Sequence, residues 1–270
     1  MKVLPSTAFR VRRTANSLKI FSQKNSVRLT PYVLLLSVFL SAPLYAATGD
    51  KAMIVSPDSR ATQAALEVLK QGGTAVDAAV TAQWVLNVVE PQASGIGGGG
   101  LFLFYDIGTR RILSFDGSAK APAKAFPKMF LDESGKPLPY QPEKNTGGLP
   151  VGVPGLLKLT EEVHAKYGTH KFPFAKLMEP AIHQAEDGAE VSATLAEALR
   201  ENAKRLVLLD PERTVFFKNG APLGEGQKFS QPELAKAFRL IQTKGVEAFY
   251  RGPIAKAIAD SVHKNAYTPR

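Results

Sequence analysis

The sequence contains no cysteine and only four histidines in 270 residues. Without cysteine the chain forms no disulfide and no thiolate metal site, so a packed core must supply its stability. The histidines make neither H-x-H nor H-E-x-x-H, which leaves a metal site without support in the sequence. Each is expected on a surface or a helix face: His164, His170, His183 and His263.

Catalytic motifs are also missing. The sequence has no G-x-x-x-x-G-K-[ST] loop for phosphates and no G-x-S-x-G elbow for a serine nucleophile. No neighbouring base would activate a serine or threonine. Paired acids such as Glu161-Glu162 fall on a predicted amphipathic helix, where a solvated face is expected. The residues by themselves therefore indicate no catalytic group and no cofactor.

Acidic residues are absent from residues 1–46, which carry seven Lys or Arg. An apolar run from Tyr32 to Ala42 follows, too short for a stable bilayer span, and Leu44-Tyr45-Ala46 offers a cleavage triplet. Basic, apolar, then small residues is the order of a secretory signal. An Arg-rich, acid-free stretch also fits a mitochondrial transit peptide, but the sharp apolar run favours export to the periplasm or the medium. No stable membrane span is expected after removal of the signal.

The basic charge belongs mostly to this signal. The whole chain has a net charge of +10, but 34 basic residues less the seven of the signal leave 27 against 24 acidic residues. No basic cluster with interleaved aromatic residues remains, so nucleic acid is not an expected partner.

The periodicity of the remaining chain predicts helices, one hairpin and a long loop. Ser56 is the expected N-cap of a helix ending at Gly72-Gly73, and a helix buried on several sides should cover Thr74 to Val89. Short strands are expected at Leu101–Tyr105 and Ile112–Phe115, and a loop at Pro122–Pro154. Further helices are expected at Leu156–Tyr167, Leu177–Asp187, from Ser192 to about Leu208, at Gln231–Thr243 behind a Ser230/Glu233 capping box, and from Pro253 to about His263. Strands and helices do not alternate, which favours a layered α+β fold over a doubly wound sheet.

Gly95 to Gly100 matches G-x-G-x-x-G by pattern. A nucleotide-binding loop needs a strand before it and a helix after it, whereas here a helix precedes and a strand follows. Two interpretations remain open. Adjacent glycines let a strand edge pass tightly against a buried helix, or they let the backbone come close to a ligand.

Six blocks in this order resemble the gamma-glutamyltranspeptidase family, over about Lys51 to His263. They are Ser56-Pro57, Gly72 to Ala79, Pro91 to Gly100, Gly147 to Gly155, Glu179-Pro180-Ala181 and Phe249 to Ala255. The resemblance implies an N-terminal nucleophile hydrolase fold, with two central sheets between helical layers (αββα). It also implies a precursor that cuts itself into a large and a small subunit, the latter beginning with the Thr that attacks the gamma-glutamyl amide of glutathione or related small molecules. No cofactor or metal is implied.

Two departures from the family pattern limit what the resemblance implies. The tail from Lys264 to Arg270 differs where the family continues, and Thr268 lacks the context of a nucleophile, so the small subunit is expected to be missing and the reading frame truncated. The family also carries an Arg in a segment Asp-x-Arg-Glu-x-Ala-Pro, which pairs with the substrate's alpha-carboxylate. Here Ser118 stands in that substrate-binding position, and Lys120 lies two residues further along.

Three hypotheses follow. In the first, residues 1–46 are a signal peptide and 47–270 a partial large-subunit domain of a gamma-glutamyltranspeptidase or glutathione hydrolase, inactive alone because it holds no catalytic residue. In the second, Ser118 marks a related acylase that acts on a non-glutamyl amide. In the third, the chain is a non-catalytic binding or scaffold protein. A piece of this kind should expose apolar faces and aggregate.

Overall fold

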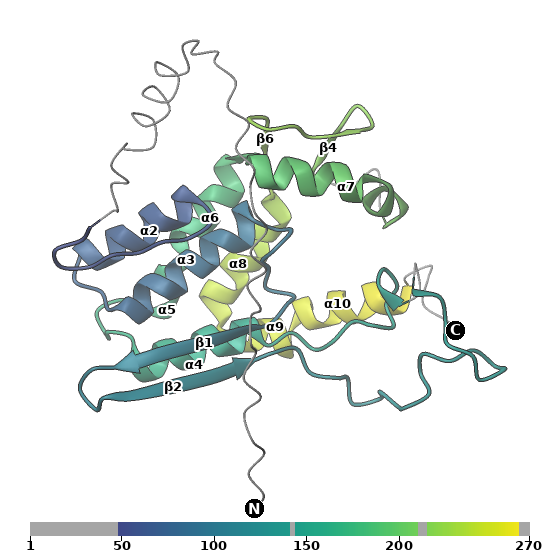
Figure 1. Cartoon of the computed structure of the whole chain (residues 1–270), viewed down its shortest axis with the longest axis horizontal. Coiled ribbons are helices and arrows are strands. Elements are labelled where there is room, and N and C mark those ends of the chain that lie inside the picture. The colour runs from purple at the N-terminus through teal and green to yellow at the C-terminus, as the bar shows by residue number, and fades with distance from the viewer. Residues whose placement is uncertain (1–47, 141–143, 210–214, 265–270) are drawn as a thin grey trace, which may run out of the picture. The chain divides into compact units, whose positions relative to one another are not determined.

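The computed structural model describes residues 48–140, 144–209 and 215–264 (Figure 1). The chain divides into two units, Met1–Thr48 and Gly49–Arg270, and every element named below belongs to the second. The predicted signal at residues 1–46 and Thr268 lie outside the described residues. In the described part of the chain, no helix is long and apolar enough to cross a membrane.

Helix α2 (Ser59–Lys70) packs along helix α3 (Ala75–Val89), as Figure 1 shows. The predicted apolar stripe of α2 is its buried face. The predicted N-cap was wrong, because Asp58 and not Ser56 accepts the hydrogen bond from the backbone N–H of Arg60. The Ser56 hydroxyl instead bonds the carbonyl of Asp58 at 2.8 Å, so Ser56 supports the cap from outside the helix.

Helix α3 is buried on nearly all sides, as its apolar sequence predicts. It begins with a capping box in which Thr74 Oγ1 accepts from the N–H of Asp77, and the Asp77 carboxylate accepts from the N–H of Thr74 at 2.8 Å. Near its other end Trp84 makes edge contacts with Phe174 and Phe238. This helix is therefore the centre of the core.

Strands β1 (Gly100–Asp106) and β2 (Arg111–Gly117) form the predicted hairpin, with Leu103 opposite Ser114. The turn holds Arg110 at a φ of +54°. Alternate residues of the hairpin face helix α4 (Leu156–Tyr167), whose Tyr167 ring contacts two of them. The aromatic residues of this inner face are Phe102, Phe104 and Phe115.

The outer face of the hairpin is exposed and largely apolar. Leu101, Leu103 and Tyr105 are 78%, 74% and 55% exposed. They alternate with the inner residues, as the period of a strand requires. In the described chain, one face of this sheet is therefore covered by a helix and the other by nothing.

The rest of the unit is mainly helical. The elements are α5 (Phe174–Leu177), α6 (Glu179–Asp187), β3 (Ala189–Glu190), α7 (Ala193–Leu209), β4 (Phe217–Lys218), β5 (Ala221–Pro222), β6 (Lys228–Phe229), α8 (Pro232–Lys244), α9 (Glu247–Tyr250) and α10 (Pro253–Lys264). Strand β3 pairs with β6 and β4 with β5, all antiparallel. The described part of the loop at Pro122–Pro154 holds turns and isolated bridges and no α-helix or strand, as expected.

One prediction in this region differs from the structure in a helix boundary, and another was wrong. The helix expected around Leu177–Asp187 is α6, which ends at Asp187 as expected but begins only at Glu179, because Pro180 is compatible only with the first turn of a helix; the short helix α5 precedes it and ends at Leu177. The Ser230/Glu233 capping box is not formed. Gln231 is the N-cap of α8 without a side-chain cap, and its amide donates to the carbonyl of Val88 on α3 instead.

Candidate functional site

The glycine run is attached to the start of α4. The carbonyl of Gly98 accepts hydrogen bonds from the N–H of Gly155, at 2.9 Å, and of Leu156, at 3.2 Å. Gly155 is the N-cap of α4 and has no side chain to satisfy these donors. The carbonyl of Gly98, from a distant part of the chain, therefore caps the N-terminus of α4.

The glycines of the run divide into two groups. A Cβ added at Gly99 would lie 2.7 Å from the carbonyl oxygen of Gly117 and from the N–H nitrogen of Ala119, and one at Gly100 would lie 3.2 Å from Leu156 Cδ1. A Cβ at Gly95 or Gly97 would meet nothing within 4 Å. Close packing thus explains the second half of the run, and space for a ligand remains only at the first. The run follows helix α3 and precedes strand β1, so the nucleotide-loop order is absent.

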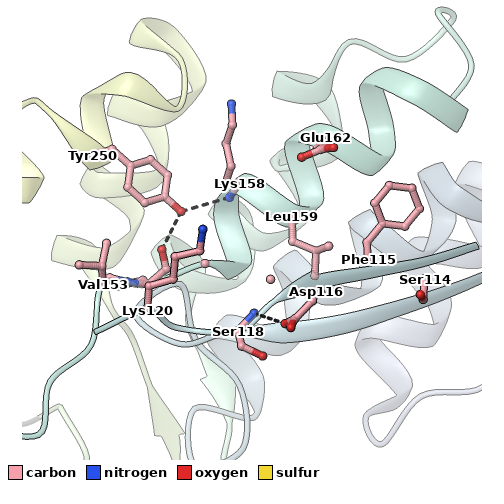
Figure 2. Close-up of a pocket in the computed structure, with 13 residues that line it drawn as sticks. Ser114, Phe115, Asp116, Ser118, Lys120, Val153, Lys158, Leu159, Glu162 and Tyr250 are labelled. Carbon is pink, nitrogen blue, oxygen red and sulfur yellow. Dashed lines mark hydrogen bonds between the residues drawn. The ribbon is translucent and has the colours of Figure 1, made fainter. Parts of the chain in front are cut away.

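A pocket of about 460 Å³ opens where β2 ends beside the start of α4 (Figure 2). Its walls come from the end of β2, the segment after it, the residues leading into α4, α4 itself and α9. The lining residues are Ser114, Phe115, Asp116, Gly117, Ser118, Lys120, Val153, Pro154, Gly155, Lys158, Leu159, Glu162 and Tyr250. Gly117 lets the two walls meet, since a Cβ there would lie 2.5 Å from Leu159 Cβ.

Ser118 is exposed at the rim and turns back onto Asp116. Its N–H donates to Asp116 Oδ1 at 2.9 Å. The side-chain and backbone hydrogen bonds of Ser118, with a smaller contribution from the charge of Lys120, hold the pKa of Asp116 below its ordinary value. An ionised carboxylate therefore stands beside Ser118.

Lys120 follows on the same edge. Its backbone pairs with Val153, donating at 3.0 Å and accepting at 2.8 Å. Among the described residues its ammonium group forms no hydrogen bond or salt bridge, and its charge acts on Asp116. The other ammonium of the pocket, Lys158, pairs with Glu161 at 2.6 Å, and this raises its pKa. Lys120 is thus the cation more available to a ligand.

Tyr250 closes the pocket from α9. Its hydroxyl donates to the carbonyl of Pro154 at 2.9 Å and accepts from the N–H of Lys158 at 3.2 Å, as the dashed lines of Figure 2 show. Burial raises the pKa of the Tyr250 hydroxyl. Tyr250 fixes the start of α4, and its own hydroxyl proton is engaged by the carbonyl of Pro154.

The described side chains of the pocket are suited to binding a charged ligand and provide no activated nucleophile. Asp116 and Lys120 offer opposite charges to a zwitterionic or carboxylate-bearing ligand. In the described part of the chain, the group hydrogen-bonded to Ser118 is Asp116, and a carboxylate of lowered pKa is a weak general base. Within the described ranges no group of three or more His, Asp and Glu side chains is placed to hold a metal ion.

Comparison with known proteins assigns these residues to a family. The family described as Gamma-glutamyltranspeptidase matches residues 61–266. The chain belongs to this family. Its sequence is 44% identical over 214 residues to the glutathione hydrolase proenzyme of Bacillus subtilis (strain 168), a match that covers 79% of this chain and 36% of that protein. It is 34% identical over 223 residues to the acylase ACY 1 proenzyme of Pseudomonas sp. (strain V22), covering 81% of this chain and 39% of that protein.

Solved gamma-glutamyltranspeptidases share the fold. The Helicobacter pylori gamma-glutamyltranspeptidase superposes with a TM-score of 0.76 at 35% identity, over 82% of this chain and 62% of that chain. A cephalosporin acylase from Bacillus halodurans superposes with a TM-score of 0.64 at 27% identity, over 83% and 43%. The predicted α+β fold of the N-terminal nucleophile hydrolases is thereby confirmed. The chain spans between a third and two fifths of the length of the curated relatives named above.

The contacts between His164 and Asp77 were not predicted from the sequence. His164 lies on helix α4, as the expectation of a surface or helix-face position allows, and its Nε2 lies 2.9 Å from the carbonyl oxygen of Phe172 and 3.5 Å from Asp77 Oδ1. The Asp77 carboxylate is fully buried and also accepts from the N–H of Thr169 at 3.0 Å. The block Gly72 to Ala79 thus carries a buried acid that joins α3 to the end of α4.

Proposed function

We propose that this chain supplies the front part of the large subunit of a glutathione hydrolase or gamma-glutamyltransferase. The enzyme would cleave the gamma-glutamyl amide of glutathione and pass the glutamyl group to water or an amino acid. The observation that carries the proposal is the family match over residues 61–266, with 44% identity to a glutathione hydrolase proenzyme. No nucleophile is assigned within this chain. The resemblance places it on the small subunit of the same precursor, which is therefore the proposed partner.

The proposed organisation is a signal at residues 1–46, followed by a large-subunit piece at residues 47–270, with the mature protein in the periplasm or secreted. The basic, apolar and small residues of the first segment support export. Mass spectrometry of the N-terminus after expression in a Gram-negative host tests this. A mature N-terminus close to residue 47 in the periplasmic fraction is expected, and an intact N-terminus in the cytoplasm would contradict it.

The second candidate changes the acyl group. Ser118 offers no positive charge to a substrate alpha-carboxylate, and it lies beside the ionised Asp116, which would repel one. A chain 34% identical to an acylase proenzyme is compatible with an acyl group other than glutamyl. In this alternative Lys120 is the remaining cation of the pocket, at a different point from the Arg of the family.

A chimaera decides between the two candidates. The matching segment of the Bacillus subtilis glutathione hydrolase proenzyme is replaced by that of this chain, and release of p-nitroaniline from gamma-glutamyl-p-nitroanilide is measured. Efficient release by the Ser118 form supports the glutathione hydrolase and eliminates the acylase. If release is poor and Ser118→Arg restores it, with Ser118→Ala as the matched control, the acyl group is different. A processed, soluble chimaera inactive in all three forms would contradict the glutathione hydrolase and would show that Ser118 alone does not decide the acyl group.

A further inference from the structure

A second pocket lies on the other helices of the unit. It has a volume of about 350 Å³ and lies over α3 between α2 on one side and α5 and α6 on the other, the group of helices that Figure 1 places together. It shares no lining residue with the pocket at the end of β2. Its lining residues are Ala64, Glu67, Val68, Gln71, Thr81, Phe172, Lys176, Leu177, Glu179, Pro180 and His183.

The pocket contains a polar group without a partner. Thr81 of α3 is completely buried, and its Oγ1 makes no hydrogen bond to any described residue. A helical threonine ordinarily donates to the carbonyl one turn earlier. Thr160 shows this kind of local bond, donating to the carbonyl of Leu157 at 3.0 Å. A buried hydroxyl left unpaired is costly, so Thr81 indicates that an acceptor is supplied from elsewhere.

The surroundings of Thr81 are apolar. Val68, Phe172 and Leu177 are each buried and belong to the hydrophobic core. Their carbon surface favours a molecule that is mostly hydrocarbon. A volume of about 350 Å³ lies within the range of roughly 300–1,000 Å³ of small-molecule sites, which combine apolar walls with a few polar groups.

The mouth of the pocket carries charges of both signs. Glu67 and Glu179 are acidic, and Lys176 is basic. At one end Lys171 Nζ donates to the carbonyl of Gln71 at 2.5 Å, which links α2 to the segment before α5. The rim has no excess of positive charge to attract an anion, and among the described residues no buried charged side chain lines the pocket to pair with a cation. An uncharged ligand therefore fits best.

We propose that this pocket binds a small, uncharged and mainly apolar molecule through one hydrogen-bond acceptor, a carbonyl oxygen to which the Thr81 hydroxyl donates. The site is independent of the glutamyl chemistry, because no residue of it lines the pocket of Ser118 and Lys120. The proposal does not depend on the proposed function.

Two probes of nearly equal shape test the proposal on the whole 270-residue chain. Acetophenone carries a carbonyl oxygen, and α-methylstyrene has a methylene group in its place. Binding is followed by the methyl resonances of Val68 and Leu177 in protein labelled with ¹³C at Val and Leu methyl groups. Acetophenone is expected to shift these resonances, with an affinity about tenfold above that of α-methylstyrene, the effect of one hydrogen bond.

Variants establish that Thr81 is the donor. Thr81→Val keeps the shape of the side chain without the hydroxyl and should reduce acetophenone affinity to that of α-methylstyrene. Thr81→Ser keeps the hydroxyl and should retain the preference, and Thr160→Val, which removes a hydroxyl outside the pocket, should do the same. Equal affinities of the two probes for the unaltered chain, or no shift at Val68 and Leu177 up to the solubility of acetophenone, would overturn the proposal. The second outcome would leave water as the only partner of Thr81.

Discussion

Two alanine substitutions in the same glycine run should have opposite consequences. Gly99 lies where an added Cβ would come within 2.7 Å of the Gly117 carbonyl oxygen and 2.8 Å of Ser118 Cα. Both contacts are backbone atoms, which cannot turn away as a flexible side chain would. The segment that would have to move is fixed by the Lys120–Val153 bridge on its far side. Gly97 meets nothing within 4 Å and, like Gly99, does not have a left-handed φ.

The expected magnitudes follow from these contacts. Forcing one extra carbon into a filled site costs about 1–3 kcal/mol, so Gly99→Ala should lower the free energy of unfolding by that amount. Gly97→Ala should be neutral or should raise it by about 0.4–1 kcal/mol, because alanine has less conformational freedom when unfolded. With a urea dependence of about 2 kcal/mol/M, the unfolding midpoints of the two variants should differ by roughly 0.5–2 M.

Urea unfolding followed by the fluorescence of the single tryptophan, Trp84, provides the assay. Trp84 lies in the core of α3 and not in the glycine run, so the probe itself is unchanged by either substitution. The m-value must be the same for both variants for the midpoints to be compared. If the two variants unfold within about 0.5 kcal/mol of each other, the range of an ordinary surface change, close packing is not what requires glycine at position 99.

Three further predictions concern other parts of the unit. Burial raises the pKa of Asp58, but its hydrogen bonds and ion pair with Arg60 outweigh this and leave the pKa below the ordinary 3.8. The ion pair therefore stabilises the fold above that pH, and this stabilisation is lost as pH falls through the lowered pKa. Asp58→Asn should lower the free energy of unfolding, measured with urea, by about 1–3 kcal/mol at pH 7 and by less at pH 3. An equal loss at both pH values would contradict this. Tyr250→Phe should cost about 1–3 kcal/mol in the same assay, because the carbonyl of Pro154 loses its donor; an unchanged midpoint would show that water replaces the hydroxyl. Leu103→Lys should reduce self-association in light scattering, because it removes an exposed apolar side chain. Ser114→Lys adds the same charge at the paired position of the hairpin without removing an apolar side chain, and should reduce self-association less. Equal effects would mean that charge alone is responsible.

The elements with strong periodicity were predictable from the sequence. The buried helix α3 and the hairpin of β1 and β2 have the apolar patterns that local reasoning can identify. The two-residue strands β3 to β6 are too short to show any period, so no pattern could have indicated them. Their pairing depends on which segments the surrounding helices bring together.

Caps were less predictable, because their partners are distant in the sequence. The side-chain amide of Gln231 donates to the carbonyl of Val88, which lies 143 residues earlier. The neighbouring Ser230 therefore did not indicate the N-cap correctly. The buried acid Asp77 bonds the N–H of Thr169, which lies 92 residues later. A sequence signal for Asp77 did exist in the Thr-x-x-Asp spacing, which resembles a capping box with Asp in place of Glu.

The candidate site was predictable only in part. The position of Ser118 followed from the resemblance of the segment after β2 to the family, and not from any local pattern. What the sequence could not indicate is that α9 contributes to the same pocket through Tyr250. The charge balance of Asp116 and Lys120 likewise depends on a turn whose conformation is set by packing of Gly117 against Leu159.

The double hydrogen bond at the carbonyl of Gly98 has a consequence for how this protein can change. Since that carbonyl holds the N–H groups of Gly155 and Leu156, the chain leaves the helical core and returns to it at a single point. The hairpin and the long loop therefore form one connection whose two ends lie side by side. The distance between these ends places no limit on the length of the connection. Because the entropy of closing such a loop grows only slowly with its length, residues around the exposed turn at Gly135 can be inserted or deleted at little cost in stability. Relatives can thus differ in the length of this connection while the helices at its two ends stay in place.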